Sequence, residues 1–199
     1  MEPAGGRIGI FGGTFDPVHT AHLEVAEAVR GALGLDRMLL VVANEPWQKQ
    51  DQRSLTPPED RFAMVEAAVE GWPGLVACRM EIDRGGPSYT IDTVRQLHEK
   101  HPAAELILVV GSDVVAGLTT WQDEPSLRRL VTLAVVGRPG VPAVPPPPGW
   151  RAVNVPVAPF DLSSTELRDR LESGRPVDGM VPEAAIRCIE QRGLYATRR

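Results

Sequence analysis

Two histidines, His19 and His22, stand three residues apart where a glycine-rich turn meets an amphipathic segment. The turn follows an apolar run, and the stretch from Gly9 to Leu23 reads GIFGGTFDPVHTAHL. A strand, a glycine turn and a helix start together predict an anion site, because the first N–H groups of a helix lack partners within the helix. Both imidazole rings can donate hydrogen bonds to phosphate oxygens that gain charge in a transition state. The stretch is neither G-x-G-x-x-G nor a P-loop, since no Gly-Lys-Ser/Thr follows.

A zinc site is the competing interpretation of the histidine pair. Zinc takes three or four protein ligands, and no third ligand stands at a recognisable spacing from His19 and His22. The two cysteines, Cys78 and Cys188, lie 110 positions apart and match no metal-ligand pattern. We therefore expect no metal held by the protein, and two reduced thiols in a cytoplasmic protein.

The composition bounds the class of protein. With 199 residues, 43% of them hydrophobic and 24% charged, the chain is expected to form a single domain over 1–199, with a C-terminal helical part at about 160–199 packed on it. A net charge of −5 argues against a nucleic-acid partner. No run of 18 apolar residues occurs, which argues against a membrane partner. Acidic and basic residues are mixed along every expected helix, so whether the chain forms a homo-oligomer stays open.

Strand-like and helix-like segments alternate along the chain. The expected strands cover 7–11, 37–43, 75–82, 105–110, 131–136 and 151–157. The expected helices are one ending near 33, 57–70, 90–100, 126–130, one ending near 172, and 182–191. Near-continuous apolar runs such as RMLLVVA are typical of strands buried on both faces. This alternation predicts an α/β fold: a doubly wound, mostly parallel, Rossmann-like sheet with helices on both faces.

Loops and helix ends follow from turn and cap residues. Thr20 is the expected N-cap of the first helix, and capping boxes at 56–59 and 163–166 are expected to open two others. Segments 44–55 and 83–87 are expected to be loops. The proline-rich segment 138–149 is interpreted as a surface connector with polyproline II character, with an SH3-type ligand as the alternative.

Polar segments follow the expected strands at the points where the strands end. They are 12–22, 44–49, 84–90, 111–113 and 163–168. In open parallel sheets, ligands bind in the crevice outside the carboxyl ends of the strands. We therefore expect these five loops to line one cleft.

These residues carry a family resemblance. GGTFDPVHTAHL resembles the T-x-F-D-P-x-H-x-G-H motif of the nucleotidyltransferase superfamily. The rest of the chain resembles the bacterial nicotinate-nucleotide adenylyltransferase family along nearly its whole length. The matching segments are PWQK at 46–49, RGGPSYTIDT at 84–93, GSD at 111–113, LSSTELR at 162–168, and Trp121 ten residues after Gly111.

The resemblance implies a reaction in which ATP and nicotinate mononucleotide give deamido-NAD and pyrophosphate, with Mg²⁺. The phosphate of the mononucleotide attacks the α-phosphorus in line. Positioning and charge stabilisation then carry the catalysis, and no protein nucleophile is needed. This agrees with the lack of any Ser-His-Asp or Cys-His arrangement in the sequence.

The resemblance also implies residue roles. The catalytic residues would be His19, His22 and Arg168. ATP would contact these three and a further set: Gly12, Gly13, Thr14, Phe15, Gly111, Asp113, Ser164 and Thr165. In this set, residues 13–15 would act through the loop backbone, Asp113 would hold the ribose or adenosine side, and 164–168 would receive the triphosphate.

The acceptor side is implied in the same way. Lys49 would meet the phosphate of the mononucleotide, Trp121 would stack on the pyridine ring, and Thr90 would take the nicotinate carboxylate. Tyr89 is either a binding or a packing residue.

One departure and two alternatives stay open. Ala21 stands where the superfamily usually has glycine; its methyl group weakens ATP binding if the backbone must approach a phosphate, and costs nothing if the residue is ordinary helix. The first alternative is a related nucleotidyltransferase that acts on another phosphorylated acceptor. The second is a nucleotide-sensing module without turnover, which would bind nicotinate mononucleotide tightly and release no pyrophosphate.

Overall fold

The computed structural model describes residues 6–46, 55–137, 145–158 and 162–196. Six strands form one sheet in the order β3-β2-β1-β4-β5-β6. Every neighbouring pair is parallel, so the prediction of a doubly wound parallel sheet is confirmed. The strands are β1 (Arg7–Gly13), β2 (Arg37–Val42), β3 (Leu75–Cys78), β4 (Glu105–Gly111), β5 (Val131–Gly137) and β6 (Ala152–Pro156).

The strand order reverses between β1 and β4. These two strands pair in the register Ile8 to Leu106 and Ile10 to Leu108, although about 98 positions separate them in the chain. Because the chain leaves β1 toward one side of the sheet and β4 toward the other, the loops after these strands diverge and leave a crevice between them. That crevice, after Gly13 and Gly111, is where the fold predicts a ligand.

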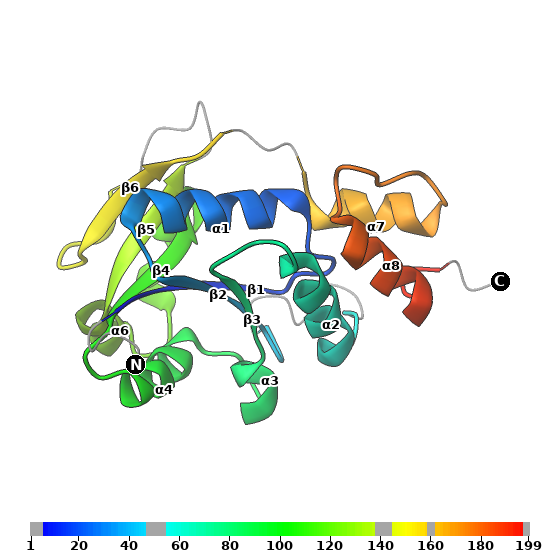
Figure 1. Cartoon of the computed structure of the whole chain (residues 1–199). Coiled ribbons are helices and arrows are strands. Elements are labelled where there is room, and N and C mark those ends of the chain that lie inside the picture. Colours follow the sequence, from blue (N-terminus) through cyan, green and yellow to red (C-terminus); the bar gives the residue numbers. More distant parts are fainter. Residues whose placement is uncertain (1–5, 47–54, 138–144, 159–161, 197–199) are drawn as a thin grey trace.

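Helices cover both faces of the sheet (Figure 1). One face carries α1 (Thr20–Leu33), α2 (Pro58–Val69), α7 (Ser164–Glu172) and α8 (Glu183–Arg192). The other carries α4 (Thr90–Lys100), the short α5 (Ser112–Val115), the 3₁₀ turn η2 (Leu118–Thr120) and α6 (Glu124–Leu130). A short helix, α3 (Met80–Arg84), follows β3.

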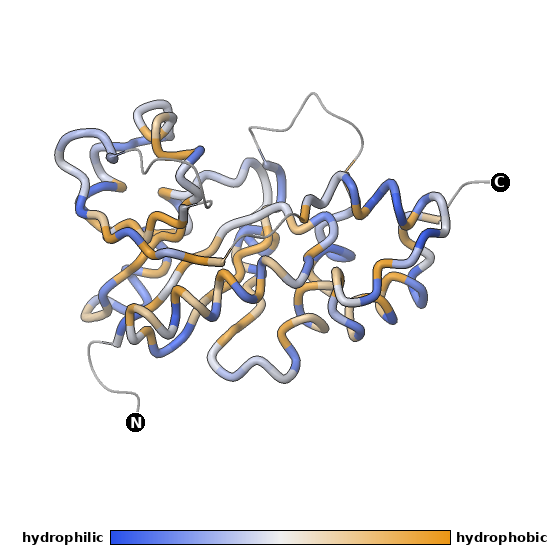
Figure 2. The backbone as a smooth tube through the Cα atoms, turned by 90° about the horizontal axis from the view of Figure 1, so that it is seen from above, coloured by the Kyte–Doolittle hydropathy of each residue, from blue (hydrophilic) through white to orange (hydrophobic). Residues whose placement is uncertain are grey.

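Alternation along the strands supplies both cores. In β4, Ile107 and Val109 face the α1 side, whereas Leu106 and Leu108 face the α4 side, because successive side chains of a strand point to opposite faces. Figure 2 shows the apolar colour following the central strands, while the helices alternate between apolar and polar positions. In the described ranges no helix is both long enough and apolar enough to cross a bilayer.

The expected strand over 75–82 is wrong in its second half. The strand ends at Cys78, and α3 begins at Met80 and includes Asp83 and Arg84, which were expected in a loop. The alternation of Met80 and Ile82 imitates a strand in the sequence. The ion pair between Arg79 Nε and Asp83, at 2.8 Å, joins residues four apart, which helical geometry brings together.

Two of the three expected caps also differ. The N-cap of α1 is His19, and Thr20 lies inside the helix, where its hydroxyl donates to the Met180 carbonyl at 2.6 Å. At α2 the N-cap is Pro57 and no side-chain cap forms, so the expected capping box with Thr56 is wrong. The cap of α7 is confirmed, since Ser163 Oγ accepts from the Glu166 N–H at 3.2 Å. In the proline-rich segment, residues 138–144 lie outside the described residues.

Contacts to the C-terminal part of the chain hold the starts of α1 and α2. The Thr20 N–H donates to the Met180 carbonyl at 2.9 Å, and Arg192 of α8 pairs with Asp60 of α2 at 2.6 Å. The C-terminal part of the chain therefore contacts the starts of both α1 and α2.

Candidate functional site

Three cavities adjoin at the carboxyl edge of the sheet, around the crevice between β1 and β4. We name each after one lining residue: the Trp121 cavity of about 360 Å³, the Ala21 cavity of about 190 Å³ and the Arg168 cavity of about 470 Å³. They share walls. Among the shared residues are Gly13 and Thr14 (Trp121 and Arg168 cavities), Gly111 and Asp113 (Trp121 and Ala21 cavities), and His19 and His22 (Ala21 and Arg168 cavities). The three cavities therefore form one branched cleft with the histidines at a junction.

The two histidine rings lie against each other. Their centroids are 3.6 Å apart and their planes differ by 26°. The backbone N–H of His19 donates to Nδ1 of His22 at 3.2 Å. Since Nδ1 of His22 accepts this bond, a neutral His22 ring carries its proton on Nε2. Phe15 packs edge-on against the same ring at 5.0 Å, which fixes its plane.

His19 is the more buried of the pair. It is 6% exposed, and burial lowers its pKa to about 4 because an apolar environment disfavours the charged imidazolium. The ring is therefore neutral near pH 7. Its Nδ1 is buried and has no hydrogen-bond partner among the described residues. Native proteins leave few such atoms unsatisfied, so this nitrogen is suited to meet a ligand.

Glycines let the turn fold tightly at both strand ends. A Cβ on Gly13 would lie 2.7 Å from the Phe15 ring, and a Cβ on Gly111 would lie 2.4 Å from Oδ1 of Asp113. The Phe15 ring is buried at 2% exposure, so only the backbone of this residue is available to the cleft. Asp113 folds back over Gly111, which places its carboxylate at the wall shared by two cavities.

Ala21 lies in the first turn of α1 and is not among the residues with positive φ. A glycine is therefore not required there for conformational reasons. The Ala21 side chain lines the cavity named after it, so the residue affects the shape of that cavity and not the strain of the backbone.

The start of α7 reaches the histidine turn from the far end of the chain. Arg168 donates to the Asp16 carbonyl at 2.6 Å and to Thr165 Oγ1 at 3.1 Å, while its Nε is buried without a partner in the described part of the chain. Ser164 Oγ donates to the Pro17 carbonyl at 3.1 Å. Ser164, Thr165 and Arg168, which were expected to bind phosphate, thus line the Arg168 cavity together with the histidines. Arg168 and Asp16 are 152 positions apart in the sequence.

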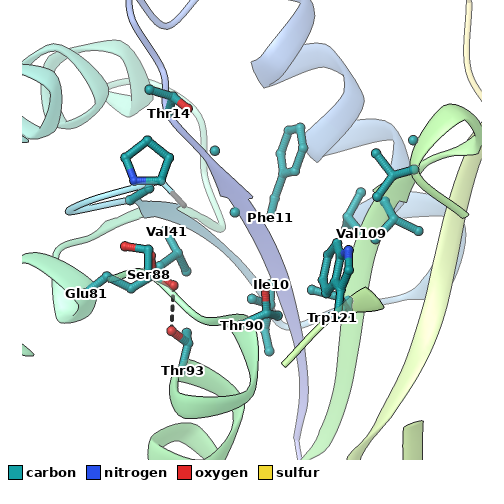
Figure 3. A pocket seen from close by; sticks show the side chains of 18 of the residues that line it. Ile10, Phe11, Thr14, Val41, Glu81, Ser88, Thr90, Thr93, Val109 and Trp121 are labelled. Carbon is teal, nitrogen blue, oxygen red and sulfur yellow. Dashed lines mark hydrogen bonds between the residues drawn. The ribbon is translucent and has the colours of Figure 1, made fainter. Parts of the chain in front are cut away.

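Two of the four expected acceptor residues, Thr90 and Trp121, line the Trp121 cavity (Figure 3). Thr90 begins α4, and Trp121 follows η2, so the two side chains line one cavity from different elements. Tyr89 is the N-cap residue of α4 and packs against the apolar core on the α4 side. Lys49 lies outside the described residues, which reach Pro46, a residue at the cavity wall.

Arg61 is a structural anchor of the site that the sequence did not reveal. It is 1% exposed, and its guanidinium donates to four backbone carbonyls: Thr14 (2.9 Å), Ala43 (2.7 Å), Asn44 (3.1 Å) and Thr56 (2.8 Å). It therefore ties the loops after β1 and β2 to the start of α2. Burial lowers the pKa of Arg61, and the nearby Asp16 carboxylate offsets only part of this.

The contact between Asp16 and Tyr195 could not be predicted from the sequence either. Asp16 is 3% exposed, and its Oδ1 accepts from the Tyr195 hydroxyl at 2.6 Å. Burial and the nearby Asp16 carboxylate raise the pKa of Tyr195. Nothing in the sequence joins these residues, which are 179 positions apart.

Across the described ranges, no three His, Cys, Asp or Glu side chains gather in a way that could hold a metal ion.

Comparisons with known proteins identify relatives. The cytidylyltransferase-like family model matches residues 10–170. The "Probable nicotinate-nucleotide adenylyltransferase" of Corynebacterium kroppenstedtii is 41% identical over 192 residues, covering 95% of this chain and 90% of its own length. The protein of the same name from Thermus thermophilus is 41% identical over 194 residues, covering 95% and 99%. The Plasmodium falciparum nicotinic acid mononucleotide adenylyltransferase, solved with NaAD, shares the fold with a TM-score of 0.75, 18% identity and coverage of 96% and 97%.

Proposed function

The chain belongs to the cytidylyltransferase-like family and, within it, to the nicotinate-nucleotide adenylyltransferases, and from this premise we propose how its cleft performs the reaction. The enzyme transfers the adenylyl group of ATP to nicotinate mononucleotide, which gives deamido-NAD and pyrophosphate in NAD biosynthesis. One observation supports the proposed division of roles: the histidine pair lies where the Ala21 and Arg168 cavities meet.

ATP is assigned to two of the cavities. The triphosphate lies in the Arg168 cavity, where the nine-residue helix α7 begins and Arg168 supplies positive charge. The adenosine lies in the Ala21 cavity, which is walled mainly by apolar residues and carries the Asp113 carboxylate for the ribose hydroxyls. The α-phosphate then lies beside His19 and His22, which line both cavities.

The acceptor is assigned to the Trp121 cavity. Its 360 Å³ lies in the range of small-molecule pockets, and its mixed lining suits an aromatic ring with a charged substituent. Trp121 stacks on the pyridine ring, and Thr90 with the first N–H groups of α4 takes the nicotinate carboxylate. Lys49 meets the phosphate of the mononucleotide by analogy with the family.

The chemical step needs no protein nucleophile. An oxygen of the mononucleotide phosphate forms a bond to the α-phosphorus of ATP, the bond from this phosphorus to the bridging oxygen of the β-phosphate breaks, and pyrophosphate leaves. The attacking oxygen is already anionic, so no general base is required. The His19 and His22 imidazoles donate to the phosphate oxygens as charge shifts, and Arg168 stabilises the leaving group.

We propose Mg²⁺ as the divalent metal, bound mainly through ATP. Asp16 is the one described carboxylate lining the Arg168 cavity, and both its oxygens accept hydrogen bonds, from Tyr195 and from the Thr56 N–H at 3.4 Å. One carboxylate is too little for a cage of protein oxygens. It suits a hard cation that takes most of its ligands from phosphate and water. Bound there, the ion neutralises charge on the phosphates. Because ATP is its substrate, we also assign the enzyme to the cytoplasm.

The test is pyrophosphate release in the presence of ATP and Mg²⁺, with each proposed residue changed in turn. The assignment predicts that Arg168→Ala raises the KM for ATP and that Trp121→Ala raises the KM for nicotinate mononucleotide. The assignment of ATP and the acceptor to different cavities would be contradicted if Arg168→Ala raised only the KM for nicotinate mononucleotide and Trp121→Ala only that for ATP. Equal rises of both KM values in both variants would contradict it as well.

A further inference from the structure

One buried carboxyl in the Trp121 cavity has no part in the reaction just described. Glu81, in the short helix α3, is 7% exposed and lines the cavity. Burial disfavours its charged form and raises its pKa. Acidic side chains are rarely buried without hydrogen bonds or charged partners, because desolvation is costly. The partners of Glu81 therefore indicate what the residue does.

Two hydroxyl groups and a guanidinium surround this carboxyl. Thr93 Oγ1 donates to Glu81 Oε1 at 2.5 Å, as drawn in Figure 3, and the Ser88 side chain also hydrogen-bonds to Glu81. Arg84 donates to the same Thr93 oxygen at 3.2 Å, and its Nη2 lies 4.0 Å from Glu81 Oε1. Glu81 thus links α3 to the first turns of α4 and to the loop before α4.

The Ser88 hydroxyl has a second bond. Its oxygen accepts from the Asn44 N–H at 2.8 Å, directly after β2. A hydroxyl has one proton, so a Ser88 proton given to Glu81 leaves the lone pairs free for the Asn44 N–H. Glu81 therefore orients the Ser88 hydroxyl, which donates to the carboxyl and accepts from Asn44.

Further bonds extend the same junction. The Ser88 N–H donates to the Glu45 carbonyl at 2.9 Å, Asn44 Nδ2 donates to the Gly86 carbonyl at 3.0 Å, and Glu45 forms a parallel bridge with Pro87. The segment after β2 and the segment before α4 are joined in this way at the mouth of the Trp121 cavity. Thr90 lies two residues after Ser88, and Pro46 two residues after Asn44.

We propose that Glu81 is a positioning residue for nicotinate mononucleotide. By accepting the protons of Ser88 and Thr93, it holds segment 86–90 against segment 44–46, so that Thr90 and Pro46 face the acceptor. This inference rests on the proposed placement of the acceptor in the Trp121 cavity. None of the residues of this network lines the Arg168 cavity, so we expect the larger effect on the acceptor side.

Steady-state kinetics of four variants and one control variant tests the proposal. Glu81→Ala is expected to raise the KM for nicotinate mononucleotide at least tenfold, with the KM for ATP within twofold of the parent enzyme. Glu81→Gln keeps an acceptor oxygen, so its KM for nicotinate mononucleotide is expected to stay within about threefold of the parent value. Ser88→Ala is expected to raise the same KM, and the double variant Glu81→Ala/Ser88→Ala to add little, because both changes break one link. Asp83→Asn, an exposed carboxylate of the same helix, is the matched control.

Several results would overturn the role of Glu81: parallel rises in both KM values, an additive double variant, or an equal effect of Asp83→Asn. If Glu81→Ala does not fold, Thr93→Val and Ser88→Ala report on the same link one hydroxyl at a time. Trp121→Ala separates this inference from the acceptor placement. An unchanged acceptor KM in Trp121→Ala would overturn the placement, whereas a raised KM there with an unchanged KM in Glu81→Ala would overturn the role of Glu81 alone.

Discussion

The Tyr195 hydroxyl donates a 2.6 Å hydrogen bond to Asp16, which joins the last described turn of the chain to the loop that carries the histidines. The Asp16 backbone carbonyl accepts from Arg168 at 2.6 Å. The phosphate side of the cleft is therefore held by residues from three distant parts of the chain, and the C-terminal segment contributes to a site that it does not line.

Tyr195→Phe removes only the oxygen that makes this bond. Hydrogen bonds to charged groups contribute about 1.5–3 kcal/mol, so we expect a loss of this order in the free energy of unfolding, measured in urea. We also expect a higher KM for ATP and an unchanged KM for nicotinate mononucleotide. Tyr89→Phe, on the acceptor side, is the control. An unaltered KM for ATP in Tyr195→Phe would show that Asp16 keeps its place without the tyrosine.

The buried His19 ring predicts a pH dependence of stability. Its pKa is about 4 in the folded protein, against 6.5 for the free side chain. Between these values the unfolded chain binds a proton that the folded protein does not. Stability contributed by the neutral ring is thus fully present above pH 6.5 and decreases as the pH falls toward 4, by at most about 1.4 kcal/mol per pH unit.

Urea unfolding at pH 7.5, 6 and 5 measures this slope. His19→Gln is expected to flatten it, whereas His98→Gln, which replaces an exposed histidine on α4, is expected to leave it unchanged. Parallel slopes in the parent protein and in His19→Gln would mean that His19 is not the group that titrates.

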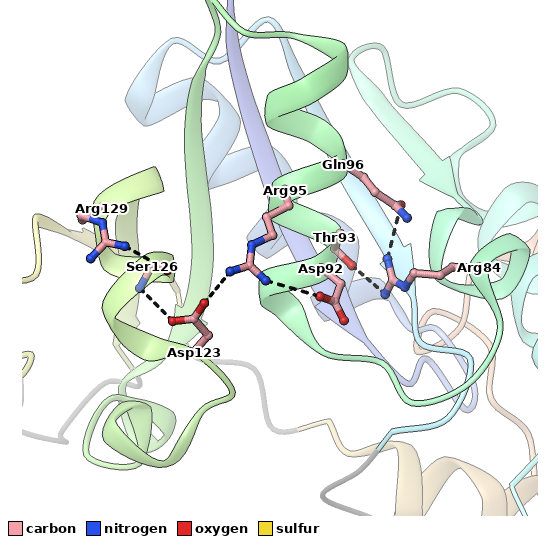
Figure 4. Close-up of polar contacts among 8 residues, drawn as sticks. All are labelled: Arg84, Asp92, Thr93, Arg95, Gln96, Asp123, Ser126 and Arg129. Atoms are coloured by element: carbon pink, nitrogen blue, oxygen red, sulfur yellow. Dashed lines mark hydrogen bonds and ion pairs between the residues drawn. The ribbon is translucent and has the colours of Figure 1, made fainter.

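Asp123 holds the turn that carries Trp121. It adopts a left-handed backbone conformation, caps α6 by accepting from the Ser126 N–H at 3.3 Å, and pairs with Arg95 of α4 (Figure 4). Because α4 also begins with Thr90, this ion pair fixes the tryptophan relative to the other wall of the acceptor cavity.

Asp123→Asn keeps the cap and tolerates the left-handed conformation, but it removes the charge. We expect this variant and Arg95→Ala each to raise the KM for nicotinate mononucleotide about two- to fivefold, as is typical of an exposed pair, and to leave the KM for ATP unchanged. The rise is expected to shrink at high salt, where the parent pair is itself screened. Arg187→Ala, which breaks an exposed pair on α8, is the control. Additive effects in the Arg95→Ala/Asp123→Asn double variant would contradict a shared contact.

Arg61→Met leaves four carbonyls without their buried donor. Each unsatisfied buried group costs about 1–3 kcal/mol, so we expect a total loss of at least about 3 kcal/mol in the free energy of unfolding. Arg61→Lys is expected to restore part of it, because one ammonium group cannot replace a planar fork of donors. Arg187→Met on the surface of α8 is expected to change stability by less than about 0.5 kcal/mol. Equal stabilities of the Arg61→Met and Arg187→Met variants would remove Arg61 from its role as an anchor.

The sequence predicts the strands and most helices well, because their periodicity is local. Segment 38–43 is apolar throughout, and strand β2 over it is buried on both faces. The helical spacing in 90–100 places Ile91 and Val94 in the core. The prediction of a strand over 79–82 failed because Met80 and Ile82 fit either a strand or a helix, and the helix is supported by contacts of Arg79 and Glu81 with residues outside this segment.

The residues of the site also fall into a group that the sequence predicts and a group that it does not. His19, His22, Asp113 and Arg168 follow from motifs that lie at strand ends and helix starts. Arg61, Glu81 and Tyr195 act through contacts between segments far apart in the chain, and a single sequence carries no sign of such pairs. For Ala21, the structure shows ordinary helical backbone, so the substitution changes the cavity wall alone.

The most direct test of the account is pyrophosphate release by the parent enzyme and by His19→Ala, with ATP, Mg²⁺ and either nicotinate mononucleotide or an unrelated sugar phosphate. We expect turnover with nicotinate mononucleotide, identified by the mass of the product, and a kcat at least about 10²-fold lower in His19→Ala, with the fold retained. Turnover with the other acceptor alone, or an unchanged kcat in His19→Ala, would contradict it.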